Sequence, residues 1–186
     1  GHHVVIATFC PPNALTVART DNRVKIYTIG DYVCSAKNVA TLRYILQENH
    51  IQVVINQWGL PLVPCRTLNK AKRGLDIKTI AVYHNQIDTN ARIKGVEIIK
   101  RYLLNLKKAA FTMVTSRSMA YVYRHTDLYQ VLSPSYVALF SKFTGIKHPD
   151  HLMVQTNPVT LDSSDFEYSI HNKQKEIIYL GRIDYN

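Results

Sequence analysis

The sequence has no uninterrupted apolar run of the roughly 18 to 20 residues that a membrane-spanning helix needs. Its first residues also lack the order of a secretory signal, in which basic residues precede an apolar core and a small-residue cleavage site. We therefore expect a cytoplasmic location. Of the 186 residues, 46% are hydrophobic, which suffices to bury the core of one ordinary domain.

Cysteine is scarce, and the few cysteines are not grouped. Cys10, Cys34 and Cys65 are odd in number and form neither a CxxC pair nor a zinc-like cluster, so we expect buried free thiols. The stretch His148-Pro149-Asp150-His151 could suggest a metal, but the proline favours a turn and no third ligand accompanies it. We therefore expect a structural role for this stretch, no metal site and no bound cofactor.

Acidic residues are also few, since 13 Asp and Glu stand against 23 Lys and Arg and leave a formal net charge of +10. Such a surplus predicts an anionic partner, and nucleic acid, an anionic membrane or a phosphate-bearing substrate would all fit. No recognised RNA- or DNA-binding signature, phosphate loop or Gly-x-Ser-x-Gly motif occurs. A basic nucleic-acid-binding α/β module therefore stays as an alternative of lower rank.

Short runs rich in β-branched residues alternate with helical stretches along the chain, which is typical of a parallel α/β fold. The predicted strands are 4–9, 24–29, 52–56, 79–83, 129–132 and 152–155, and the predicted helices are 36–49, 62–75, 92–124 with a break, and 135–144. Because the strand-like runs lack strict alternation, we expect strands buried on both faces. The predicted fold is a doubly wound, mostly parallel, Rossmann-like sheet.

The two ends of the sequence suggest a fragment. The chain enters a strand at once, so we expect the first strand of the doubly wound unit to be missing. A polar stretch with Ser163, Ser164 and Asp165 reads as a linker, and a new apolar run at 177–180 follows it. The predicted organisation is an α/β domain at 1–160, a linker at 161–175 and the first strand of a truncated second domain at 176–186.

Four local motifs occur in an order that resembles one enzyme family. They are Gly1-His2-His3-Val4, Tyr83-His84-Asn85, Gln130-Val131-Leu132-Ser133, and Asn157-Pro158-Val159 followed by a strand-like run that ends in Gly181-Arg182. Together they resemble the retaining glycosyltransferases of family 4, which have two facing Rossmann-like domains in the GT-B architecture. The chain looks like the acceptor-side half of such an enzyme.

The resemblance implies transfer of a sugar from a nucleotide-sugar donor to a glycan or lipid-linked acceptor in capsule or lipopolysaccharide biosynthesis. It implies no metal or other cofactor. The glycine-rich turn after the family's first strand and the Lys and Glu of its second domain are absent, so we expect the fragment alone to be inactive. A sugar-nucleotide 2-epimerase has a similar architecture, but its catalytic carboxylates do not occur at the expected loops.

Ligands of open α/β sheets bind beyond the carboxyl ends of the strands, so candidate site residues are those that directly follow strands. His84 ends a predicted strand, and the resemblance implies that it hydrogen-bonds the donor sugar near the reacting centre, with Asn85 beside it. The resemblance also implies that Gly181 and Arg182 bind the donor diphosphate.

Two further groups of candidates follow strands. Asn56, Gln57 and Trp58 could form a sugar platform of amides and an indole, or Trp58 could be a buried anchor under the following segment. Ser133 could contact the sugar, but either Ser133 or Ser135 is the expected cap of the helix that follows.

The helix at 92–110 carries a stripe of apolar residues, namely Val96, Ile99, Leu103, Leu106 and Ala110. Lysines and an arginine lie beside and opposite this stripe. We expect the stripe to face the core, while the basic flank is a candidate for peripheral contact with an anionic membrane at its inner face.

Overall fold

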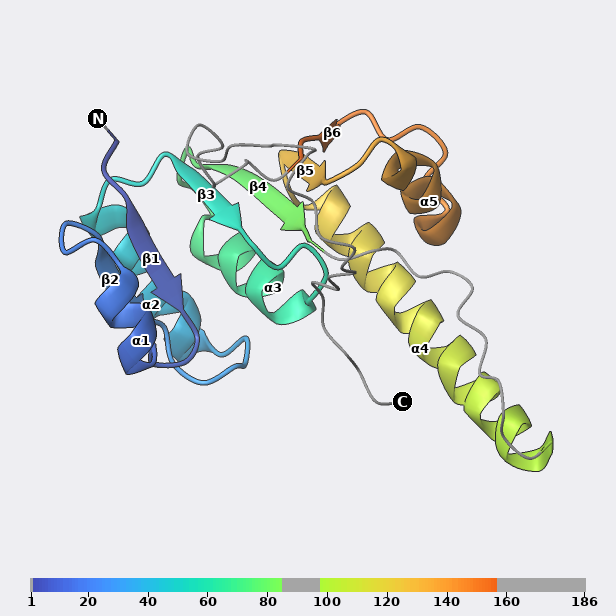
Figure 1. Cartoon of the computed structure of the whole chain (residues 1–186). Helices are drawn as coiled ribbons and strands as arrows, with labels where there is room; N and C mark the ends of the chain where they lie inside the picture. Colours follow the sequence, from blue (N-terminus) through green and yellow to red (C-terminus); the bar gives the residue numbers. More distant parts are fainter. Residues whose placement is uncertain (1, 85–97, 157–186) are drawn as a thin grey trace, which may run out of the picture. The chain divides into compact units, whose positions relative to one another are not determined.

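The computed structural model describes residues 2–84 and 98–156 (Figure 1). Its strands are β1 (Val5–Thr8), β2 (Lys25–Thr28), β3 (Val53–Asn56), β4 (Lys78–Tyr83), β5 (Leu128–Val131) and β6 (Leu152–Val154). Its helices are α1 (Ala14–Arg19), α2 (Ala36–Glu48), α3 (Leu62–Ala71), α4 (Ile98–Arg124) and α5 (Ser135–Thr144). All six predicted strands are present, each within two residues of its predicted bounds.

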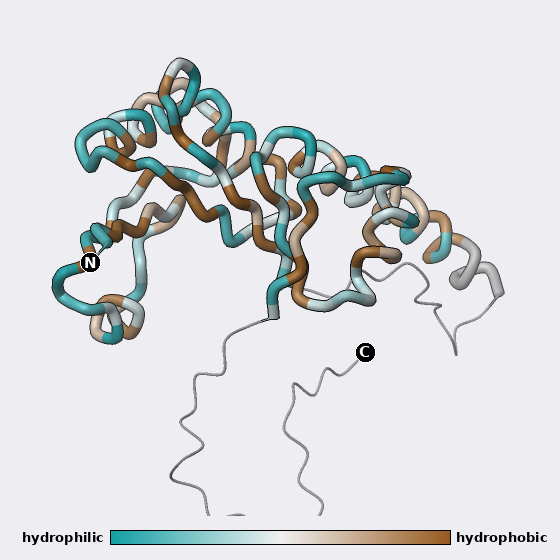
Figure 2. The backbone as a smooth tube through the Cα atoms, turned by 90° about the horizontal axis from the view of Figure 1, so that it is seen from above, coloured by the Kyte–Doolittle hydropathy of each residue, from teal (hydrophilic) through white to brown (hydrophobic). Residues whose placement is uncertain are grey.

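The strands are all parallel and form two sheets in the described part of the chain. One sheet pairs β1 with β2, and the other has the order β3-β4-β5-β6. Helices separate successive strands, which confirms the predicted Rossmann-like α/β fold. Parallel neighbours require such crossover connections. Hydrophobic and hydrophilic stretches alternate along the backbone (Figure 2), and among the described residues no helix is long and apolar enough to cross a bilayer.

Two buried clusters hold these layers together. The first joins α3, α4 and α5 to β4 and β5 around Tyr129 and Phe140, both fully buried. The second joins α2 and α3 to β2 and β3, with Leu42, Ile45 and Leu68 at its centre. Tyr27 of β2 and Val54 of β3 both pack against this cluster, so the same cluster joins strands of both sheets.

Local sequence explains where the helices begin and end. The Ser35 side chain accepts a hydrogen bond from Asn38 N at 3.1 Å and so caps the start of α2. Helix α5 ends at Gly145, whose φ of 75° is the left-handed conformation that glycine adopts at helix ends. Helix α3 is shorter than predicted because the chain turns after Lys72, close to Gly74 with its φ of 76°.

Several expectations about the elements were wrong. Helix α1 was not predicted, and over the described residues 98–124 helix α4 runs without the expected break; residues 92–97 of the predicted helix lie outside the described residues. The strands are not all covered on both faces, since Val53 is 50% and Ile55 55% exposed while Val54 packs against the second cluster. Among the described residues, helices thus cover one face of β3 only.

The apolar stripe expected on the helix at 92–110 does not face the core in its described part, since Leu103 is 60% and Leu106 51% exposed. The helix packs against α3 and α5 only further along, where its buried residues are Met119, Ala120, Val122 and Tyr123.

The expectation of buried thiols holds for one cysteine. Cys65 is buried in α3, Cys34 is half-buried and Cys10 is exposed. Cys10 differs because it lies in the loop after β1, where the chain leaves the core. Burial raises the pKa of the Cys65 thiol to about 11, against the smaller effects of Asn69, Lys72 and Arg66, so this thiol is protonated at neutral pH.

Candidate functional site

His84 and Gln57 come together at the side of the larger sheet where its parallel strands end, which we call the carboxyl edge. His84 directly follows β4 and Gln57 directly follows β3, which are neighbouring parallel strands. His84 Nε2 lies 2.6 Å from Gln57 Oε1, and both side chains are exposed. Because a carboxamide oxygen only accepts, the Nε2–H of His84 donates this bond, and no described residue makes a hydrogen bond with Nδ1.

The loop after β3 is held tightly against the end of β4. Gly59 N donates to Val82 O at 2.9 Å, and the buried Tyr129 hydroxyl donates to Gly59 O at 2.6 Å. Burial raises the pKa of Tyr129, so its phenol keeps the proton that this bond uses. The loop therefore presents Gln57 and Trp58 on a fixed base.

Asn56 shapes the same loop from within. Its Oδ1 accepts a hydrogen bond from Trp58 N at 3.1 Å, an arrangement typical of an Asx turn. Its Nδ2 is buried and has no hydrogen-bond acceptor among residues 2–84 and 98–156. Both groups of this amide face the protein, so Asn56 supports the turn that carries Gln57 and Trp58.

Three aromatic rings form a row that joins the carboxyl ends of strands from both sheets. Trp58 after β3 meets Tyr32 after β2 edge-on, with centroids 5.6 Å apart, and Tyr32 meets Phe9 after β1 at 5.4 Å. Trp58 is 55% and Tyr32 39% exposed. Trp58 is therefore not the buried anchor that was one of its two interpretations, and its exposure agrees with the other, a platform.

The loop that carries Tyr32 is fixed by a buried side chain. Asn38 is only 3% exposed, and its Nδ2 donates to Asp31 O at 2.6 Å and to Val33 O at 2.8 Å. The two carbonyls belong to the residues on either side of Tyr32, so these bonds hold the backbone of its loop in place. We did not predict Tyr32, Phe9 or Asn38, although Phe9 and Tyr32 end or follow predicted strands as the other candidates do.

Ser133 lies in the loop between β5 and α5, where its hydroxyl meets that of Ser135 at 2.9 Å. The expected cap is absent, because α5 has no side-chain cap and Tyr136 N instead donates to the Ser133 carbonyl. No hydrogen bond joins Ser133 to His84 in the described part of the chain. Asn85, Gly181 and Arg182 lie outside the described residues.

The motif His148-Pro149-Asp150-His151 packs on a core tyrosine. The imidazole of His151 stacks on Tyr123 with centroids 3.8 Å apart, and the Tyr123 hydroxyl donates to Asp150 Oδ1 at 2.9 Å. Hydrogen bonds from Tyr123 and His151 lower the pKa of Asp150. Among the residues described, no group of three His, Cys, Asp or Glu side chains could hold a metal ion.

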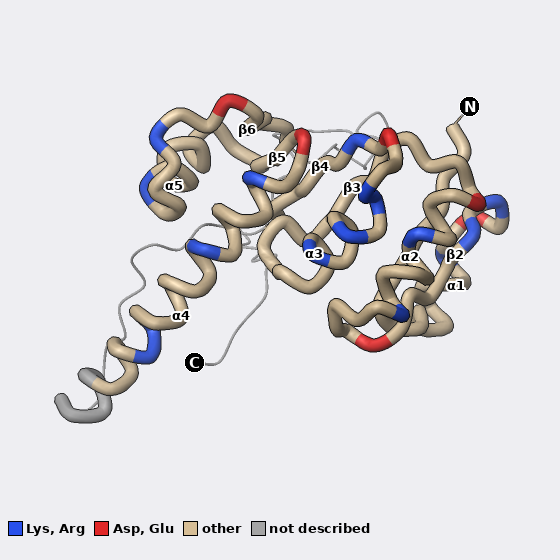
Figure 3. The backbone as a smooth tube through the Cα atoms, turned by 180° about the vertical axis from the view of Figure 1, so that it is seen from behind, with Lys and Arg blue, Asp and Glu red and all other residues tan. Residues whose placement is uncertain are grey.

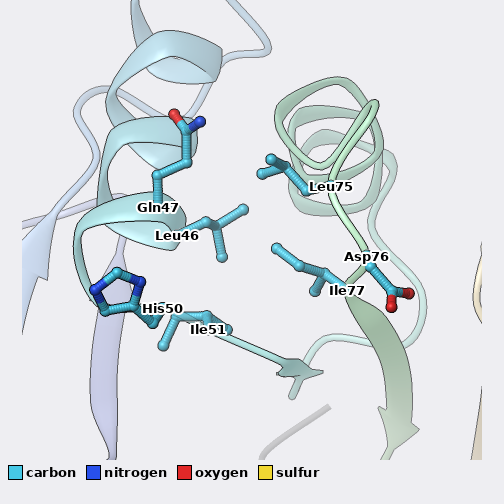
Figure 4. Close-up of a pocket in the computed structure, with 7 residues that line it drawn as sticks. All are labelled: Leu46, Gln47, His50, Ile51, Leu75, Asp76 and Ile77. Atoms are coloured by element: carbon cyan, nitrogen blue, oxygen red, sulfur yellow. The ribbon is translucent and has the colours of Figure 1, made fainter.

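A hollow of about 330 Å³ lies elsewhere, where β3 and β4 begin (Figure 4). Leu46, Leu75 and Ile77 line it, and His50 and Asp76 stand on opposite sides of it (Figure 4). Its lining is mostly that of the second core cluster, so we assign it to packing.

The carboxyl edge thus combines an imidazole, a carboxamide and two partly exposed aromatic rings. Imidazole and amide groups hydrogen-bond hydroxyls, and aromatic faces stack on the apolar face of a pyranose ring. This combination suits a neutral, hydroxyl-rich ring better than a phosphate, because no described lysine or arginine takes part. The chain matches no known family model, and no curated protein or solved structure shows significant similarity to it.

Proposed function

We propose that this domain is the acceptor-side half of a retaining glycosyltransferase and binds a sugar at the carboxyl edge of its strands. The observation that carries the proposal is the His84–Gln57 hydrogen bond of 2.6 Å on the edge that also carries the exposed Trp58. The position agrees with the general rule that open parallel sheets bind ligands beyond their carboxyl ends. The enzyme class itself rests on the sequence resemblance.

In this proposal the complete enzyme transfers a sugar from a nucleotide-sugar donor to a glycan or lipid-linked acceptor. Transfer requires stabilisation of a cationic, oxocarbenium-like sugar and of the departing diphosphate. His84 would contact the donor sugar at the reacting centre, with Asn85 beside it, while Gly181 and Arg182 would take the diphosphate. Gln57, Trp58 and Ser133 would contact the acceptor sugar, on a turn held by Asn56.

Trp58 supplies a direct test, because it is the only tryptophan of the chain and it is exposed. We expect its fluorescence to change in a saturable way when the chain is titrated with a panel of methyl hexopyranosides and nucleotide hexoses. Gln57→Ala and His84→Ala should each weaken this titration about tenfold, the cost of about one hydrogen bond at a binding site. Their thermal unfolding should change little, since both side chains are exposed.

Gln47→Ala is the matched control, because Gln47 is an exposed glutamine near the end of α2, beside the hollow where β3 and β4 begin. It should titrate like the parent chain. If no sugar of the panel alters the fluorescence, the sugar site is refuted. Salt-sensitive binding of an oligonucleotide in the same assay would instead favour the basic nucleic-acid-binding alternative.

A further inference from the structure

Tyr32 and Trp58 form an open corner at one end of the candidate site. Their ring planes are inclined at 63° with the centroids 5.6 Å apart, and Trp58 is 55% and Tyr32 39% exposed. Tyr32 also rests against Phe9, which packs on the second core cluster. An edge-to-face pair leaves ring faces uncovered, so the two planes are walls against which a flat, partly apolar ring can lie.

The position of Tyr32 in this corner is set by a tight turn. Asp31 O accepts hydrogen bonds from Val33 N at 2.7 Å and from Asn38 Nδ2 at 2.6 Å, which places Tyr32 at the centre of a three-residue turn. Gly30 leaves room for this arrangement, because a Cβ there would lie 2.5 Å from Asn38 Oδ1. The turn is therefore formed before a ligand arrives, which lowers the entropic cost of binding.

The corner continues the His84–Gln57 pair along the strand ends. Strands β1 and β2 lie on one side of β3, and β4 lies on the other (Figure 1). The loop with Gln57 and Trp58 follows β3, so it lies between Tyr32, which follows β2, and His84, which follows β4. Because neighbouring strands are about 4.8 Å apart, this elongated site suits a ligand of consecutive rings.

The loops that carry the aromatic row have little charge. Residues 9–13, 29–35 and 57–61, which follow β1, β2 and β3, include one acidic residue, Asp31, and no lysine or arginine. The basic residues lie on other parts of the chain (Figure 3). Helix α4 has no aspartate or glutamate, and its basic residues are Lys100, Arg101, Lys107, Lys108, Arg117 and Arg124. The elongated site therefore favours a neutral ligand over a phosphorylated or acidic one.

Two kinds of ligand stack on exposed aromatic rings, namely sugars and proline-rich segments. A glycan uses both ends of the elongated site, because each sugar has an apolar face for the rings and hydroxyls for the imidazole and the carboxamide. A proline-rich segment has no hydroxyls on its rings and would use chiefly the corner. The combination of groups favours the glycan.

We propose that Tyr32 and Trp58 form a second sugar subsite, which stacks the sugar next to the one held at Gln57, so that the acceptor is a neutral glycan of two or more sugars. This inference rests on the proposed sugar site and extends it to Tyr32. Asn38 is a positioning residue, because it is buried and its bonds fix the turn of Tyr32.

The test is isothermal titration calorimetry of the full chain, which does not depend on the fluorescence of Trp58 beside the altered ring. The probes are matched pairs of one and two sugars: methyl β-glucopyranoside with methyl β-cellobioside, methyl α-glucopyranoside with methyl α-maltoside, and methyl β-galactopyranoside with methyl β-lactoside. In at least one pair the disaccharide should bind about tenfold more tightly. Tyr32→Ala should remove this preference and leave the affinity for the monosaccharide unchanged, whereas Tyr32→Phe should retain most of it.

Tyr44→Ala is the matched control, because Tyr44 is a 61% exposed tyrosine of α2 outside the aromatic row, and it should bind like the parent. Asn38→Ala should reduce the affinity for the disaccharide alone. Circular dichroism should show Tyr32→Ala folded, since its side chain is exposed, and this variant decides the test.

The outcomes separate this subsite from the sugar site on which it rests. If no sugar of either length binds, the sugar site itself is refuted. Equal affinity for both members of every pair, or a preference that survives Tyr32→Ala, would overturn the second subsite alone. Binding of a decaproline peptide that is tighter than that of any disaccharide and is lost in Tyr32→Ala would also overturn it, in favour of a peptide partner.

Discussion

At the residue scale, Asp127 ties α3, β4 and β5 together. Its Oδ2 accepts hydrogen bonds from the backbone N of Thr79 at 2.8 Å and from the hydroxyl of Thr79 at 2.7 Å, and Lys72 Nζ lies 3.4 Å away. Partial burial acts to raise the pKa of Asp127, but the bonds from Thr79 and the charge of Lys72 outweigh it and lower this pKa to about 2.

This shift predicts how stability depends on pH. Because the folded pKa lies below the unfolded value of 3.8, the carboxylate stabilises the fold fully above pH 3.8 and loses that effect as the pH falls towards 2. The side chain is 39% exposed, so solvent screening keeps the contribution near 1 kcal/mol. Asp127→Asn should lower the free energy of unfolding at neutral pH by about that amount.

Urea unfolding at a series of pH values measures this contribution. The difference between the parent and Asp127→Asn should shrink steadily below pH 3.8. Asp21→Asn is a suitable control, because Asp21 pairs only with Arg23 in an exposed turn among the described residues. A pH-independent difference for Asp127→Asn would show that the carboxylate charge has no part in the contact.

At the element scale, Gly59 sets how closely the loop after β3 approaches β4. A Cβ at this position would lie 2.8 Å from Val82 O and 3.0 Å from Tyr83 N, both backbone atoms. We expect Gly59→Ala to destabilise the fold by about 2–3 kcal/mol, because neither atom can move without disturbing the strand. Chemical denaturation at neutral pH measures this loss.

Gly74→Ala provides the comparison. Gly74 has a φ of 76° but no atom within 4 Å of the added Cβ, so its substitution introduces backbone strain alone. It should cost about 1 kcal/mol. If the two substitutions had equal effects, the close approach of the loop to β4 would be refuted.

The elements themselves could be predicted well from the sequence, but their surroundings could not. Strand 79–83 was recognisable because its β-branched run is short and lies between helical stretches. Helix α1 was missed because only six residues form it, too few to show a periodic pattern. The stripe with Leu103 and Leu106 was assigned to the core because periodicity reports that one face is apolar, not what covers that face.

In the candidate site, too, the positions of residues along the chain could be predicted but their tertiary contacts could not. The strand-end rule selected Gln57, Trp58 and His84 as candidates, and the structure brings Gln57 and His84 within hydrogen-bond distance. The rule could not reveal that Tyr32 meets Trp58, because that contact joins loops of two different sheets. It also could not show that Asn38, inside α2, fixes the loop of Tyr32. Such contacts depend on tertiary packing.

At the scale of the whole molecule, the parallel α/β class could be predicted because it follows from the alternation of elements. The division into two sheets could not, since sequence patterns do not specify which strands pair. In the described residues β1 and β3 each form a sheet edge, and Ile6, Val53 and Ile55 are exposed on them.

The net charge of +10 predicts how the fold responds to salt. Among the described residues, the ion pairs that join different elements all involve Asp127, so repulsion between like charges outweighs attraction over long distances. Raising the ionic strength from about 0.01 M to about 0.15 M shortens the Debye length severalfold and should raise the Tm by a few degrees. Differential scanning calorimetry in sodium chloride checks this, and a lower Tm at the higher ionic strength would contradict it.

The absence of acidic residues from α4 has a consequence for control of the protein. No carboxylate within this helix offsets the charge of its lysines and arginines. A covalent modification that removes a lysine charge would therefore lower the net positive charge of α4 without changing any ion pair inside the helix.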